Sequence, residues 1–224
     1  MPGTTKLALF NEALSLCRET RLASLSEDRE ARHLLDQVYD GGGIRRVLED
    51  GQWHFAMRTV RVDTDPDLDP DFGFQYPYSK PTDWVLTSAL CADEYFRSPL
   101  TAAQYVDESG YWYADVDPIY VRYVSDDEDY GGDLGMWPQS FVDYAVAHFA
   151  GKVVMKLTSD KELQQIILGP RFDGMGGLVG GRRKFALSRN AMVSGTRTSP
   201  PGSWSSARRG GGRGDGGSNS NLTG

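Results

Sequence analysis

Five aspartates stand at every second position in one short stretch of the chain, a pattern that could bind a hard cation. They are Asp63, Asp65, Asp67, Asp69 and Asp71. Calcium prefers several carboxylate oxygens from one short loop, but the register of an EF-hand fails here. A loop that begins at Asp67 places Phe72 at the position of the turn glycine and Tyr78 at that of the bidentate glutamate. We therefore interpret this stretch as a solvated acidic loop, and likewise the run at 126–129.

Other residue types that could do chemistry lack the spacing that chemistry needs. The glycines of the stretch 174–181 miss a dinucleotide-binding fingerprint by one position, and Arg182 and Arg183 stand where a Walker A loop needs Lys-Ser/Thr. The chain has no Gly-x-Ser-x-Gly motif and no recognisable cysteine-histidine pair. The sequence predicts neither a cofactor site nor an enzyme.

The two cysteines and three histidines favour structural roles. Cys17 falls in an apolar helical stripe and Cys91 ends an apolar run, so both are predicted to be buried free thiols. His33, His54 and His148 are isolated from one another and show no ligand spacing, so no metal site is expected. No apolar run is long enough to span a bilayer, so we expect no membrane partner.

Charge is divided unevenly along the chain, whose net charge is -7. The first 181 residues carry 16 Lys and Arg against 30 Asp and Glu, whereas residues 182–224 carry eight basic residues and one aspartate. A basic segment of Gly, Ser, Pro and Arg cannot form a core by itself, but it can dock on an acidic partner. We predict that the following residues bind a neighbouring protein: Arg182, Arg183, Lys184, Arg189, Arg197, Trp204, Arg208, Arg209 and Arg213.

The N-terminal part of the chain is predicted to be helical. Apolar residues recur at spacings of three and four from Leu7 to Cys17, with Thr4 or Thr5 available as the N-cap. Ser26 is expected to cap a second helix that runs to Val38. Glycines 41–43 then mark either a break or a close backbone crossing.

The middle of the chain is predicted to form strands. Side chains alternate from Trp53 to Thr59, and strand-like runs cover 84–91, 103–106, 111–114 and 119–124, with a turn at 107–110. The segment between the first strand and Trp84 is expected to be an irregular loop.

Helical periodicity returns after Trp137 and Pro138. One apolar stripe runs from Val142 to Leu157, and Phe141, Ala145 and His148 lie off it, so we expect those three to present apolar surface to neighbouring subunits. Ser159 and Glu162 fit a capping box for a following helix that ends at Pro170. The glycines of 174–181 disfavour helix, which is expected to resume only over 185–192.

The predicted fold class is therefore α+β, with a helical bundle formed by the N- and C-terminal helices, an inserted antiparallel β domain and an extended C-terminal tail. The expected boundaries are 1–52 and 133–192 for the helices of the bundle, 53–132 for the β domain and 193–224 for the tail.

A spaced pattern over about residues 5–190 resembles the head-to-tail adaptor proteins of tailed bacteriophages, and more specifically the tubular tail protein A family of short-tailed phages. The matching stretches are 8–16, 23–39, 53–56, 119–124 and 137–158. Glycines 41–43 and the tail after Ser194 depart from the family pattern.

The resemblance implies a structural protein of the virion neck, present in the host cytoplasm during assembly. It implies a ring, commonly of twelve copies, that joins the portal protein to the tail nozzle and lets DNA pass through without sequence-specific binding. An acidic body suits this role because it would repel the phosphates of the passing genome. The alternatives are a virion-associated cell-wall hydrolase and a nucleic-acid-binding protein that acts through its Arg/Gly-rich tail.

Overall fold

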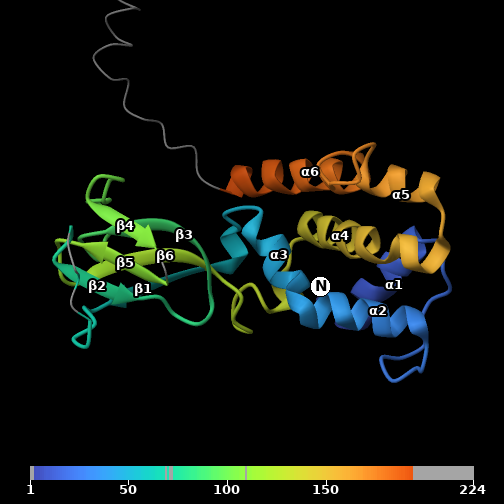
Figure 1. Ribbon diagram of the computed structural model, residues 1–224, viewed down its shortest axis with the longest axis horizontal. Coiled ribbons are helices and arrows are strands. Elements are labelled where there is room, and N and C mark those ends of the chain that lie inside the picture. The colour runs from blue at the N-terminus through green and yellow to red at the C-terminus, as the bar shows by residue number, and fades with distance from the viewer. Residues whose placement is uncertain (1–2, 69, 71–72, 109, 194–224) are drawn as a thin grey trace, which may run out of the picture. The chain divides into compact units, whose positions relative to one another are not determined.

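The computed structural model describes residues 3–68, 70, 73–108 and 110–193. Along the chain, a run of antiparallel strands stands between two runs of helices, and the helices of both runs lie together (Figure 1). The chain divides into two units, Met1–Ala191 and Met192–Gly224, and the contacts described below belong to the first. The predicted α+β class, with a bundle of N- and C-terminal helices and an inserted antiparallel β region, is confirmed. The four domain boundaries stay predictions, and the tail from residue 194 lies outside the described residues.

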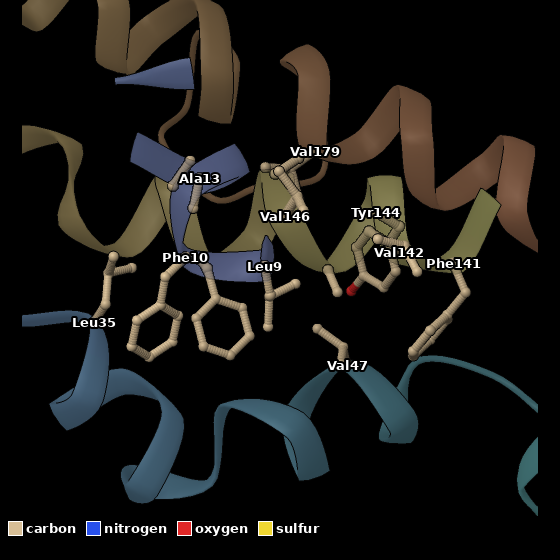
Figure 2. Close-up of a cluster of buried hydrophobic side chains, with 14 of the residues drawn as sticks. Leu9, Phe10, Ala13, Leu35, Val47, Phe141, Val142, Tyr144, Val146 and Val179 are labelled. Atoms are coloured by element: carbon tan, nitrogen blue, oxygen red, sulfur yellow. The ribbon is translucent and has the colours of Figure 1, made fainter. Parts of the chain in front are cut away.

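The helices of the bundle come from both ends of the described region. They are α1 (Lys6–Leu16), α2 (Glu30–Val38), α3 (Ile44–Glu49), α4 (Gln139–Thr158), α5 (Lys161–Leu168) and α6 (Gly177–Val193). Figure 2 shows how Leu9 of α1, Leu35 of α2 and Val47 of α3 converge on α4, with Val179 of α6 beside Val146. Each of these side chains is buried, which stabilises the bundle by about 1.5–3 kcal/mol per large aliphatic residue.

Helix α4 lies at the centre of the bundle, and this corrects one expectation from the sequence. Phe141 and Ala145, predicted to face neighbouring subunits, are 1% and 0% exposed, and the imidazole of His148 is largely buried. The centre of the Phe141 ring lies 4.7 Å from the ring centres of both Trp53 and Trp137. Because α4 contacts α1, α2, α3 and α5, almost every side of it is covered, so periodicity along one stripe underestimates its buried surface.

Several helix ends differ from the predicted ones. Thr5 caps α1 as predicted, accepting a hydrogen bond from the Ala8 amide at 3.2 Å. Ser26 does not cap α2. The helix begins at Glu30, its N-cap residue Arg29 makes no side-chain capping bond, and the Ser26 hydroxyl forms a hydrogen bond with that of Ser24 instead.

The predicted capping box before α5 is also wrong. Ser159 adopts a left-handed backbone conformation that ends α4, with φ 52°. Asp160 is the N-cap of α5 and accepts hydrogen bonds from the amides of Glu162 and Leu163 at 2.9 and 3.0 Å. A carboxylate in this position satisfies two otherwise unpaired amides and complements the helix dipole.

The three glycines between α2 and α3 form a kinked turn at Tyr39–Gly43, and both predicted roles are realised. The break lies at Gly42, whose φ of 86° and ψ of 23° are in the left-handed region that glycine adopts without steric cost. The close crossing lies at Gly43, where a Cβ atom would stand 2.5 Å from the Val38 carbonyl oxygen and 3.0 Å from the Phe149 ring.

The strands form two antiparallel three-stranded sheets. The strands are β1 (Met57–Val62), β2 (Tyr76–Ser79), β3 (Trp84–Cys91), β4 (Tyr105–Glu108), β5 (Tyr111–Ala114) and β6 (Ile119–Ser125). One sheet has the order β1-β6-β3 and the other β2-β5-β4. Between them lies a second core that includes Tyr78, Trp112 and Tyr123, all 0% exposed.

Three features of the strand prediction are wrong. Strand β4 covers Tyr105–Glu108 rather than 103–106, because residues 107 and 108, predicted to belong to the turn, still pair with β5. His54–Ala56 is a short 3-10 helix, and β1 begins only at Met57, because Trp53 turns inward to the bundle and donates its indole N–H to the Val47 carbonyl. Strand β2 lies within the segment expected to be an irregular loop. It is an edge strand, where Pro77 costs the sheet no ladder hydrogen bond.

Polar contacts as well as apolar packing attach the first sheet to the bundle. The Arg45 guanidinium lies 2.9 Å from Asp126 and also donates to the carbonyl of Trp84. Within the sheet itself, Arg58 of β1 pairs at 2.8 Å with Asp83, which precedes β3 and is 12% exposed. The acidic run that begins at Asp126 is therefore not simply a solvated turn, because its first carboxylate holds β6 against α3.

Candidate partner-binding surface

Helix α6 carries four of the nine residues predicted to bind a partner: Arg182, Arg183, Lys184 and Arg189. The helix begins at Gly177, eight residues before the predicted Phe185, because its glycines allow close packing that outweighs their low helix propensity. A Cβ atom on Gly180 would lie 2.1 Å from the Met175 carbonyl oxygen. Val179, Gly180 and Ala186 form the buried face of the helix.

Two of these four basic residues attach α6 to the rest of the bundle. Arg182 donates a hydrogen bond of 3.0 Å to the Asp143 carbonyl of α4. Arg183 lies 3.4 Å from the carboxylate of Asp50, which follows α3, and 3.3 Å from the sulfur of Met175. The guanidinium groups of both thus contact acceptors within the chain.

The carboxylate of Asp50 also accepts a hydrogen bond from the hydroxyl of Tyr144. Burial, together with this carboxylate, raises the pKa of the Tyr144 phenol well above its usual range. The phenol therefore stays protonated and donates. Asp50 therefore links α3, α4 and α6 through two different donors.

The other two basic residues face solvent. Lys184 and Arg189 are exposed, and the Arg189 guanidinium lies 5.7 Å from the centre of the Phe185 ring. Phe185 is itself 56% exposed. The outer face of α6, which we define as Lys184, Phe185 and Arg189, therefore combines two cations with one exposed aromatic ring.

More exposed apolar side chains lie on α5 and on the turn before α6. Ile166 is 59% exposed, Phe172 46% and Met175 62%. Ile166 borders a shallow groove that Pro170 and Gly177 also line. The next residue, Ile167, turns inward instead, as expected when neighbouring helix positions differ by about 100°.

The remaining predicted residues lie outside the described part of the chain: Arg197, Trp204, Arg208, Arg209 and Arg213. Asp69 and Asp71 of the alternating acidic stretch lie outside it as well. Of the other aspartates in that stretch, Asp63 pairs with Arg61 at 2.7 Å, and Asp65 accepts from the hydroxyl of Ser79.

The described residues include the types of side chain that can bind metals or act as thiol nucleophiles. Within them, no three His, Cys, Asp or Glu side chains gather where they could hold a metal ion. Both cysteines are buried free thiols, as predicted, and burial raises the pKa of Cys17 to about 11 and also raises that of Cys91. A high pKa keeps a thiol unreactive. No helix among the described residues combines the length and apolar character that crossing a bilayer requires.

Comparison with known proteins adds no relative to these observations. No family model matches the chain, and no curated protein matches it in sequence.

Proposed function

We propose that this chain is a non-enzymatic head-to-tail adaptor of a tailed bacteriophage. In this proposal it forms a ring, of twelve copies by analogy with the family that it resembles, between the portal protein and the tail nozzle. DNA passes through the lumen without sequence-specific binding, and the protein belongs to the virion neck after assembly in the host cytoplasm.

The observation that carries the proposal is the exposed surface of α5 and α6. Ile166, Phe172, Met175 and Phe185 are each between 46% and 62% exposed. Large apolar side chains exposed on α5, on the turn after it and on α6 are unfavourable in a monomer and typical of a subunit that buries them in an assembly. Lys184 and Arg189 add positive charge, which suits an acidic partner surface.

The architecture and the charge distribution are compatible with the same role. The resemblance implies a helical bundle with an inserted β domain, and the chain has that fold class. The first 181 residues hold almost twice as many acidic as basic side chains. An acidic lumen would repel DNA phosphates and let the genome slide, whereas a basic lumen would grip it.

Electron microscopy of the purified protein, alone and mixed with its portal protein, tests the proposal directly. We expect rings that cap the portal. The absence of both rings and portal association would refute the proposal. Clearing of cell-wall material in zymography would favour the hydrolase alternative, and DNA binding that weakens steeply with salt would favour the nucleic-acid alternative.

Substitutions on the outer face of α6 test the surface itself. Phe185→Asp should abolish assembly into rings and association with the portal. It should leave the melting temperature of the isolated protein nearly unchanged, because the Phe185 side chain is already exposed. Ser15→Asp, at an exposed position of a different helix, α1, is the matched control because it also introduces one carboxylate. Equal association of both variants would exclude this face from the interface.

The predicted docking role of the C-terminal tail has its own test. Deleting residues 194–224 should reduce incorporation of the protein into particles. Full incorporation of the truncated chain would overturn that prediction.

A further inference from the structure

A pocket of about 500 Å³ opens at the kink between α2 and α3, far along the chain from the outer face of α6. Glycines 41–43 form one wall, Arg46 and Glu49 of α3 form another, and His148 and Lys152 of α4 close it. Two segments that are about a hundred residues apart in sequence, the kink with α3 and the middle of α4, thus meet around one depression.

The cations of this pocket have donor capacity to spare. Lys152 is exposed and forms no ion pair with any residue that the structure describes. Arg46 uses one terminal nitrogen, Nη1, on Glu49 at 3.0 Å, which leaves the other nitrogens of its guanidinium for another acceptor.

The glycines keep the mouth of the pocket open. A Cβ atom on Gly41 or Gly42 would meet nothing within 4 Å, so any longer side chain there would extend into free space. Gly43 provides close packing at the kink, and Gly42 provides its positive φ, but Gly41 has φ -75° and needs no glycine for its backbone conformation. Bare backbone at Gly41 leaves room for a ligand.

We propose that this pocket binds a phosphate-bearing anion through Lys152 and Arg46. A tetrahedral anion with several acceptor oxygens can take hydrogen bonds from an ammonium and a guanidinium at once, and charge-assisted bonds of this kind are the strong ones. Glu49 is the internal competitor, because it occupies part of the Arg46 guanidinium when the pocket is empty.

Calorimetric titration of the full chain with inorganic phosphate tests the proposal, with sodium chloride adjusted to hold ionic strength constant. Titration with a mononucleotide and with its uncharged nucleoside distinguishes a free ion from a phosphate carried on a larger molecule. Binding of phosphate or of the mononucleotide, but not of the nucleoside, supports the proposal. No saturation by either at tens of millimolar overturns it.

Three substitutions assign the binding to this pocket. Lys152→Glu should weaken binding about tenfold or more, because it removes one charged hydrogen bond and adds repulsion. Gly41→Asp should weaken it similarly by placing a carboxylate at the open wall. Glu49→Gln should tighten it several-fold, because the competitor loses its charge.

The matched control is Lys156→Glu, one turn along α4, which makes the same change in net charge at an exposed lysine outside the pocket. Its affinity should stay within about twofold of the unmodified chain. If Lys156→Glu weakens binding as much as Lys152→Glu, the effect comes from overall charge and the pocket assignment is wrong. Backbone amide NMR shifts at Gly41 and Gly42 give a local readout that does not depend on stability.

Discussion

Protonation of one histidine should make the stability of this fold depend on pH. The His148 ring lies between the rings of Tyr144 and Phe149, at 6.4 and 6.3 Å between centres, and the described residues offer its buried Nε2 atom no hydrogen-bond partner. Burial, with smaller contributions from Lys152 and Arg46, lowers the pKa of His148 to about 4, against an opposing contribution from the carboxylate of Asp50.

The size of the effect follows from the difference between the folded and unfolded pKa. In the unfolded chain the pKa is 6.5, so between pH 6.5 and 4 the unfolded state takes up a proton that the folded state refuses. The free energy of unfolding therefore falls as the pH falls through this window, by at most about 1.4 kcal/mol per pH unit. From pH 7 to pH 5 the loss is about 2 kcal/mol, and below pH 4 it is complete at about 3 kcal/mol.

Urea unfolding at pH 7 and pH 5 measures this loss as a double difference. In His148→Leu the loss between the two pH values should be about 2 kcal/mol smaller than in the unmodified chain, since all other titrating groups are shared. Phe149→Leu is the control: it removes packing beside the same site, costs about 1 kcal/mol at both pH values and retains the pH dependence. Equal losses for the unmodified chain and His148→Leu would refute the argument.

Three further predictions concern packing and buried polar groups. Gly43→Ala should lower the free energy of unfolding by about 1–3 kcal/mol in urea titrations, because its Cβ would overlap a carbonyl oxygen, whereas Gly41→Ala should be nearly neutral; equal effects would contradict the geometry of the kink. Lys80→Ala should lower the free energy of unfolding by about 2 kcal/mol and change tryptophan fluorescence, because Lys80 pairs with the partly buried carboxylate of Asp107 and lies 3.9 Å from the centre of the Trp84 ring. A loss of less than about 0.5 kcal/mol would contradict this. In the folded chain Cys17 should react with a disulfide reagent about a hundredfold more slowly than a free thiol, because its pKa is about 11, and burial should slow the reaction of Cys91 as well. In denaturant both cysteines should react at the rate of free thiols. Rapid labelling of the folded chain would contradict the buried positions.

Local features of the fold could be predicted from the sequence because they depend on neighbouring residues. Thr5 precedes an apolar repeat, and its hydroxyl reaches an amide three residues away. The hairpin of β4 and β5 needs only two short runs and the glycine at 110, whose φ is 85°. Both signals are complete within about ten residues, so no distant partner was needed to interpret them.

Features that depend on distant partners could not be predicted. Strand β2 is defined by pairing with β5, and its own residues, including Pro77, do not indicate a strand. Gly180 looks unfavourable for a helix until the Met175 carbonyl is known to lie against it.

The predicted binding residues show the same limit. Arg182 and Arg183 are adjacent to Lys184 in sequence and chemically similar to it, but only the two arginines reach acceptors in the bundle. Charge alone identified the segment as basic. It could not separate the side chains that hold α6 in place from those left for a partner, because that distinction depends on the face of the helix.

Strand β6 belongs to both cores of the described region. Val124 lies in the core of the helical bundle, whereas Ile119, Val121 and Tyr123 lie in the core between the two sheets. If either core unfolded, one part of β6 would lose its packing contacts while the rest of the strand remained packed in the other core. The helices and the sheets should therefore lose structure together, in one cooperative transition, although the chain order alone would describe them as separate modules.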